Sequence, residues 1–144
     1  MSVTPFPFHE PGPLGDSLRT LARNVDGYQP DGAPSWRAHV ASLLNPIRDA
    51  FERHRAETEG DTGLYAELVQ DAPRLAHEAD CLVQEHANLD DALARLADIA
   101  SARDLDPDLL RRAAQSVVGG LDRHRQRDSD LVYEAYTTDI GGLG

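Results

Sequence analysis

The sequence predicts an all-α protein, folded as an up-and-down four-helix bundle. Apolar residues make up 40% of its 144 residues. Val and Ile are few, whereas Ala, Leu, Arg, Asp and Glu dominate, and no stretch alternates apolar and polar residues over the length of a strand. Along three long segments, apolar residues recur instead at steps of three and four, which is the spacing of a helix with one buried face. Short connections between such helices favour antiparallel neighbours.

The length favours one domain, because the chain can bury a sizeable core but is short for two. We expect the helical bundle over residues 14–138. Residues 1–13 are rich in proline and predict an extended N-terminal arm, and residues 139–144 predict a flexible tail rich in glycine.

The first helix is expected from Leu14 to about Gly27, and a loop rich in proline and glycine follows it. Asp16 or Ser17 would accept hydrogen bonds from the unpaired N–H groups at its start. Its buried face would consist of residues at helical spacing: Leu14, Leu18, Leu21 and Val25.

The second helix is expected over residues 35–59, with Ser35 as its N-cap. Pro46 lies inside it, and an internal proline costs about 3 kcal/mol, so two helices meeting at Asn45 are the alternative. We favour one kinked helix, because the apolar stripe continues through Pro46 in register. The stripe consists of Trp36, Val40, Leu43, Ile47, Ala50, His54 and Glu57.

A short helix over residues 64–70 should precede a longer helix over residues 73–102, because Pro73 suits a first turn. The stripe of the longer helix is apolar except at one position. It consists of Leu75, Ala79, Leu82, His86, Leu89, Leu93, Leu96 and Ala100.

The last helix has a strong start signal and is expected over residues 107–136. Asp106 is a capping residue, Pro107 suits the first position, and the acid Asp108 lies near the positive end of the helix dipole. The stripe of this helix consists of Leu110, Ala114, Val117, Leu121, His124, Asp128, Leu131 and Ala135.

A histidine therefore interrupts the stripe of each long helix. A single histidine on an apolar stripe is usually a hydrogen-bonded core residue. Three histidines on three antiparallel helices can meet at one depth of the bundle, and two of the stripes also carry a carboxylate, Glu57 or Asp128. A buried carboxylate without compensation costs several kcal/mol.

A metal ion would neutralise these carboxylates directly. Imidazole and carboxylate ligands suit iron, manganese or zinc. Salt bridges to arginines are the competing explanation, but the arginines adjacent to the stripes should point elsewhere on their helices. The candidate metal ligands are His54, Glu57, His86, His124 and Asp128.

The other histidines are weaker candidates. His77 lies nine residues before His86 and should face the opposite way, toward solvent. His39 flanks the stripe about four turns from His54 and is expected to be structural. His9 belongs to the N-terminal arm.

Composition disfavours several classes of protein. The net charge of −11 repels phosphate backbones, so a nucleic-acid partner is not expected. No apolar run approaches the roughly 18 residues of a membrane span, and no secretory signal is visible, so we expect a cytoplasmic protein without a membrane partner. The only cysteine, Cys81, cannot form an internal disulfide.

The order of these features resembles the hemerythrin-like, HHE cation-binding family over residues 35–136. The resemblance rests on His54 with Glu57, the turn Gly63-Leu64-Tyr65, the run Gln84-Glu85-His86, and the run His124-Arg125-Gln126-Arg127-Asp128. It implies a four-helix bundle that commonly holds a non-haem di-iron centre, used for oxygen binding, redox sensing or metal handling. It also implies metal-ligand roles for His54, His86, His124 and Asp128.

The chain departs from the family pattern in its ligands. The position four residues after His54, a glutamate in the family, is Thr58 here, with Glu57 and Glu59 beside it. The positions four residues either side of His86 hold no histidine, although the oxygen carriers have a histidine pair on this helix. The predicted first helix has no histidine at all. We therefore do not expect oxygen transport.

The sequence thus predicts a metal-binding helical bundle, with iron or another divalent metal as cofactor. Its expected role is oxygen or redox sensing or metal handling, with dioxygen as a further ligand, and no catalysis is expected. The alternative is a metal-free helical bundle that acts through protein contacts.

Overall fold

The computed structural model describes residues 12–29 and 32–142, with side chains up to Thr137. The regular secondary structure of these residues is helical, without strands, which confirms the predicted all-α class. The elements are α1 (Gly12–Asp26), α2 (Ala33–Thr58), α3 (Leu64–Asp71), the 3₁₀ turn η2 (Pro73–Leu75), α4 (Ala76–Ser101) and α5 (Pro107–Gly142). Residues 1–11 of the predicted arm, which include His9, and residues 30–31 of the predicted loop lie outside the described residues, whereas residues 12–13 of the predicted arm begin α1.

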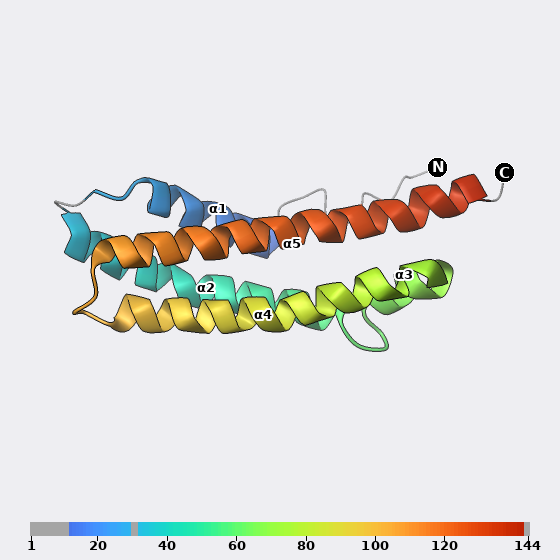
Figure 1. Cartoon of the computed structure of the whole chain (residues 1–144), viewed down its shortest axis with the longest axis horizontal. Helices are drawn as coiled ribbons and strands as arrows, with labels where there is room; N and C mark the ends of the chain where they lie inside the picture. The colour runs from blue at the N-terminus through green and yellow to red at the C-terminus, as the bar shows by residue number, and fades with distance from the viewer. Residues whose placement is uncertain (1–11, 30–31, 143–144) are drawn as a thin grey trace.

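Four of the helices form the bundle, with α4 and α5 lying side by side along the long axis of the molecule (Figure 1). Helix α2 packs on α4, and α1 fills the space between α2 and α5 over one half of the bundle. The short helix α3 contacts α2, α4 and α5 at the other end. The bundle is thus formed by α1, α2, α4 and α5 over one half and includes α3 over the other.

Most element boundaries agree with those expected from the sequence. Helix α2 is continuous through Pro46, as predicted, and Asp106 accepts a hydrogen bond from the backbone N of Asp108 at 3.0 Å, as a cap should. The prediction of Ser35 as a cap is wrong. Helix α2 begins at Ala33 with Pro34 in its first turn, and no side chain caps it. Helix α5 continues to Gly142, beyond the expected end near Tyr136.

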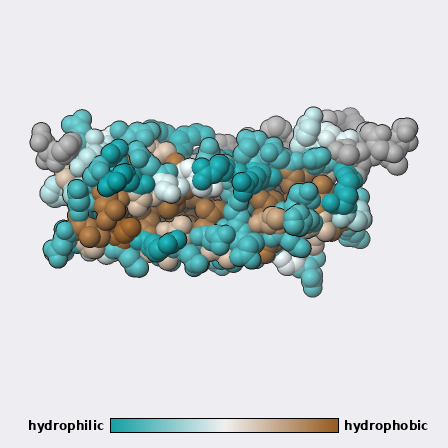
Figure 2. Space-filling view, in the orientation of Figure 1, coloured by the Kyte–Doolittle hydropathy of each residue, from teal (hydrophilic) through white to brown (hydrophobic). Residues whose placement is uncertain are grey.

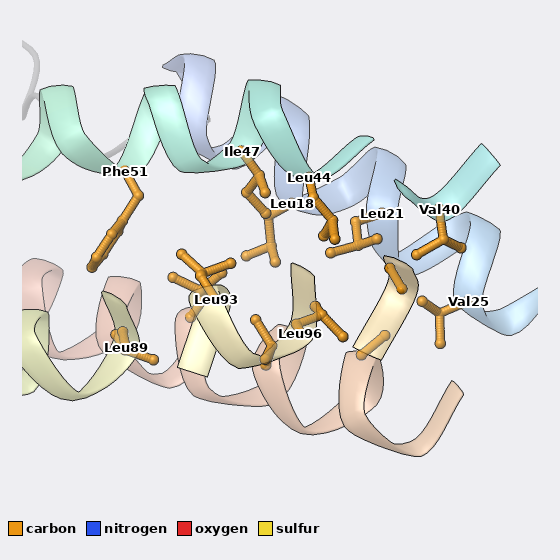
Figure 3. Close-up of a cluster of buried hydrophobic side chains, with 14 of the residues drawn as sticks. Leu18, Leu21, Val25, Val40, Leu44, Ile47, Phe51, Leu89, Leu93 and Leu96 are labelled. Carbon is orange, nitrogen blue, oxygen red and sulfur yellow. The ribbon is translucent and has the colours of Figure 1, made fainter. Parts of the chain in front are cut away.

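Two separate apolar clusters fill the interior. The first lies between α1, α2, α4 and α5, and Figure 3 shows it with Phe51 at one end. Its members include Leu18, Leu21, Val40, Leu44, Ile47, Phe51, Leu89, Leu93, Leu96 and Leu121. The second cluster includes Tyr65, Leu68, Leu75, Ala79, Leu82, Leu131, Val132 and Ala135. The stripe residues of α4 and α5 pass from one cluster to the other, and the polar positions His86, His124 and Asp128 lie between them.

The stripes of α4 and α5 are buried at every predicted position, but the stripe of α2 departs from its prediction. Leu44 is buried where Leu43 was expected, and Thr58 is buried where Glu57 was expected. The cause is the period of the helix: with 3.6 residues per turn, either three or four residues can complete a turn, and from Val40 and from His54 the longer step reaches the buried residue.

The face of the molecule that Figure 2 shows is mainly hydrophilic, with apolar side chains visible in patches along α4 and α5. Among the described helices, none is both long and apolar enough to cross a membrane.

Candidate metal centre

The three stripe histidines meet in the middle of the bundle. His54 comes from α2, His86 from α4 and His124 from α5. The Nε2 atom of His124 lies 2.9 Å from Nε2 of His86 and 3.3 Å from Nε2 of His54. The side chains of His86 and His124 are fully buried, and His54 keeps 10% of its side chain exposed. We refer to these three residues as the histidine cluster.

The carboxylate of Asp128 joins the histidine cluster from α5. Its Oδ2 atom lies 2.9 Å from Nε2 of His54 and 3.2 Å from Nε2 of His124. Its other oxygen, Oδ1, accepts a hydrogen bond from the hydroxyl of Tyr65. This hydrogen bond fixes the plane of the carboxylate, so that Oδ2 faces the imidazoles.

Glu57 does not take part in this arrangement. Its side chain is exposed, so the prediction that it points into the core is wrong. The reason is the step after His54, which is four residues and not three, so that Thr58 lies on the buried face and Glu57 turns outward. The carboxylate that does reach the histidine cluster from this end of α2 is Glu59, the C-cap residue.

Two glutamates hold the far side of two imidazoles. Nδ1–H of His86 donates to Oε2 of Glu59 at 2.5 Å, and Nδ1–H of His124 donates to Oε1 of Glu85 at 2.6 Å. Because an ionised carboxylate can only accept, the proton of each neutral imidazole lies on Nδ1 and the lone pair lies on Nε2. The Nε2 atoms of His86 and His124 therefore face into the centre, and each carries a lone pair there when its imidazole is neutral.

The loop between α2 and α3 positions Glu59 and Tyr65 beside the histidine cluster. Gly60 has a φ of +84°, in the left-handed region that favours glycine. At Gly63 an added Cβ would lie 2.3 Å from the carbonyl oxygen of Glu59, so only glycine fits. This tight turn follows Glu59 directly and places Tyr65 on the first turn of α3, over the histidine cluster.

Aromatic rings close the centre on two sides. The ring of Phe51 lies edge-on to His86 and His124, with centroid distances of 5.7 and 6.4 Å, and it separates the centre from the first apolar cluster. On the other side, the ring of Tyr65 stacks on His86 at 5.8 Å. The centre is thus shielded from water by apolar contacts.

Burial and charge shift the titration of these groups in opposite directions. Burial, together with the neighbouring imidazoles, lowers the pKa of His86 to about 4, despite its hydrogen bond to Glu59. Burial also acts to lower the pKa of His124, but its interactions with Asp128 and Glu85 outweigh burial and raise that pKa. Burial acts to raise the pKa of Asp128, yet the histidines hold it well below its ordinary value. Asp128 is therefore ionised at neutral pH although its side chain is buried.

Tyr65 and Glu59 titrate outside their ordinary ranges as well. Burial and then the charge of Asp128 raise the pKa of Tyr65, so its hydroxyl keeps its proton and serves as a donor. Burial acts to raise the pKa of Glu59, but the hydrogen bonds with His86 and Arg55 lower it overall. Glu59 is therefore an ionised acceptor at neutral pH.

The donor atoms have the spacing of ligands around a single ion. Two ligands about 2.1 Å from one metal lie about 3.0 Å apart at right angles and about 3.4 Å apart at the tetrahedral angle. Nε2 of His124 lies 2.9 and 3.3 Å from the Nε2 atoms of His86 and His54, and Oδ2 of Asp128 lies 2.9 and 3.2 Å from the Nε2 atoms of His54 and His124. Oδ2 is buried, and its polar neighbours are the Nε2 atoms of His54 and His124, which could equally act as metal ligands beside it. A cation therefore fits the donor set.

The remaining histidines of the described residues lie elsewhere. His39 and His77 are exposed, and the prediction that His77 faces solvent is confirmed. Within the described part of the chain, the one group of three or more metal-type side chains with ligand atoms within 4.8 Å of one another is His54, His86 and His124.

Sequence reasoning missed Glu59, Glu85 and Tyr65, because none of them lies on a counted stripe. A signal was present for two of them, since Glu85 directly precedes His86 and Tyr65 follows the turn glycine Gly63.

Comparison with known proteins agrees with the geometry. Neither the curated proteins nor the solved structures give a match. The family model of the hemerythrin HHE cation-binding domain matches residues 14–136, which is most of the chain and includes every residue of the centre. The chain therefore belongs to the hemerythrin HHE cation-binding domain family.

Proposed function

We propose that this protein binds a single metal ion, iron in the first place, between α2, α4 and α5. The ligands are Nε2 of His54, His86 and His124 and the Oδ2 atom of Asp128. Glu57 is not included, because its side chain is exposed on the surface of α2.

One observation carries this proposal. Nε2 of the buried His124 lies 2.9 Å from Nε2 of the buried His86 and 3.2 Å from Oδ2 of the buried Asp128, so nitrogen and oxygen donors gather where a positive charge is stabilised, and a divalent cation can take the place of a proton on His124. Arg53, Arg123 and Arg127, the arginines adjacent to the stripes in the competing explanation, do not pair with Asp128, because their side chains are exposed and the charge contacts of Asp128 are with histidines. A divalent cation would neutralise the charge of Asp128 and bind the three Nε2 atoms together with Oδ2.

The role we propose is oxygen or redox sensing, or metal handling. Three imidazoles and one carboxylate suit iron, manganese or zinc, and a bound iron would supply one-electron redox chemistry and open positions for a small ligand such as dioxygen. The residues of the chain contribute a fixed donor set, a second layer of carboxylates and apolar walls that limit access of water. Oxygen transport by a pair of irons is not proposed, because the donor set suits one ion.

The test is metal analysis of the wild-type protein and of the variants His86→Ala and His124→Ala, each purified without chelator and then reconstituted with ferrous iron. We expect the wild type to retain a single equivalent and to change its visible spectrum reversibly between air and reductant. Both variants should lose the ion, because each lacks one of the central donors.

The matched control is His77→Ala, which removes an exposed histidine from the same helix as His86. It should retain the metal at the wild-type level. Unchanged metal content in both His86→Ala and His124→Ala would refute metal binding at this centre and would favour a bundle that acts through protein contacts. A visible spectrum of the iron-loaded protein that does not change on addition of reductant would refute the redox role but not metal binding.

A further inference from the structure

Two arginine residues extend the centre outward to solvent. The guanidinium of Arg55 donates from Nε to Oε2 of Glu59 at 3.1 Å, and Arg127 donates to Oε2 of Glu85. Each glutamate in turn accepts from one histidine of the cluster. The result is two triads: Arg55, Glu59 and His86 form the Glu59 triad, and Arg127, Glu85 and His124 form the Glu85 triad.

The two triads share a layout although their residues come from different elements. In each, the histidine side chain is fully buried and the glutamate is partly exposed, 26% for Glu59 and 20% for Glu85. The Glu59 triad joins the C-terminal end of α2 to α4, and the Glu85 triad joins α4 to α5. Arg127 is the most exposed member, at 58%, and lines a groove of about 390 Å³ between α4 and α5.

We infer that Glu59 and Glu85 are positioning residues of the metal centre, which fix the ring orientation and tautomer of His86 and His124 and thereby set the affinity for the ion. This inference rests on the proposed function. It adds that two glutamates outside the donor set, neither of them a predicted ligand, determine how well the donor set works.

The physical reason is the competition between the two nitrogens of a neutral imidazole. A proton on Nε2 would block the atom that faces the ion, whereas a carboxylate at Nδ1 keeps the proton there. The negative charge of the carboxylate also makes Nε2 a stronger donor. Each arginine holds its glutamate in place, so the glutamate cannot turn away into solvent.

The experiment compares metal affinity, measured by chelator competition, in alanine and glutamine variants of both glutamates. Glu59→Ala and Glu85→Ala should weaken binding by about 10–100-fold, the usual effect of removing such a partner. Glu59→Gln and Glu85→Gln should recover part of that loss, because the amide oxygen still accepts from Nδ1–H. The matched control is Glu57→Ala, which removes the same charge two residues from Glu59 at an exposed position.

A spectroscopic readout separates positioning from general stability. In the cobalt-substituted protein, the visible bands report the ligand geometry, and they should shift in Glu59→Ala and Glu85→Ala but not in Glu57→Ala. In the metal-free glutamine and alanine variants, nitrogen-15 NMR of the imidazoles reports the tautomer directly. It should show protonated Nδ1 in the wild type and the glutamine variants, and a mixture in the alanine variants.

The possible failures are distinguishable. If His86→Ala and His124→Ala bind metal as well as the wild type does, the proposed function fails. If those variants lose the metal while Glu59→Ala and Glu85→Ala keep wild-type affinity and spectra, only the positioning role is overturned. An equal loss in Glu57→Ala would also overturn it, because the effect would then be one of overall charge. Should an alanine variant not fold, protonated Nδ1 in the wild type together with a metal affinity of the glutamine variants below that of the wild type supports the inference. Protonated Nε2 in the wild type contradicts it.

Discussion

Chelation of the metal-loaded protein is expected to lower its melting temperature by about 8–16 °C. A ligand that binds only the native state at a free concentration of about 1,000 times its Kd stabilises that state by roughly 4.1 kcal/mol. In a domain of about this size, each kcal/mol of stability corresponds to about 2–4 °C. The measurement is thermal unfolding by circular dichroism, with the free metal concentration buffered before chelator is added.

The control for this result is the His124→Ala variant under the same conditions. It lacks a central donor, so chelator should leave its melting temperature unchanged. An unchanged melting temperature in the wild-type protein would mean that the histidine cluster consists only of hydrogen-bonded core residues, which is the metal-free alternative.

Replacement of Phe51 by alanine is expected to destabilise the metal-free protein by about 3–5 kcal/mol, the usual range for a buried phenylalanine. Phe51 is fully buried, and its ring contacts both the first apolar cluster and the imidazoles. The lost ring would leave a cavity at the boundary between them. Because domains of this kind are stable by only about 5–15 kcal/mol, the loss would be a large share of the total.

The measurement for Phe51→Ala is urea denaturation followed by circular dichroism. Leu109→Ala is the control, because Leu109 is 37% exposed and its truncation should change the stability by no more than about 0.5 kcal/mol. A loss below about 1 kcal/mol in Phe51→Ala would contradict the packing of this ring against the centre.

The features that periodicity encodes were predictable from the sequence. On α4 and α5, the count of three and four residues placed every stripe residue in the interior, including His86, His124 and Asp128. A long helix with a regular buried face carries this information in local sequence alone. The class of the fold and the three histidine positions therefore follow from the sequence.

The features that depend on the choice between a step of three and a step of four residues, or on distant pairing, were not predictable in the same way. Glu57 was misplaced because steps of three and of four residues both stay near one face of a helix, and the step after His54 that stays buried is four, which reaches Thr58. The contacts of Glu59 and Glu85 join residues 27 and 39 positions apart, and no period within one helix encodes them. They follow from how the helices pack and from the turn between α2 and α3.

The same contrast applies to the cap of α2. Ser35 has the chemistry of a cap, but the helix begins earlier, with Pro34 in its first turn. Proline is preorganised for this position because its φ matches the helix and it lacks an N–H group that would need a partner. Residue type alone is compatible with a helix that begins after Ser35 and with one that begins before Pro34, so it did not distinguish the two.

The most direct test of the central claim is anomalous X-ray diffraction from crystals of the iron-loaded protein, measured at the iron edge. We expect one strong peak between α2, α4 and α5, at about 2.0–2.2 Å from Nε2 of His86 and His124 and from a carboxylate oxygen of Asp128. His54 should complete the set from α2. A peak only at surface carboxylates such as Glu57, or no peak inside the bundle, would contradict metal binding by this cluster.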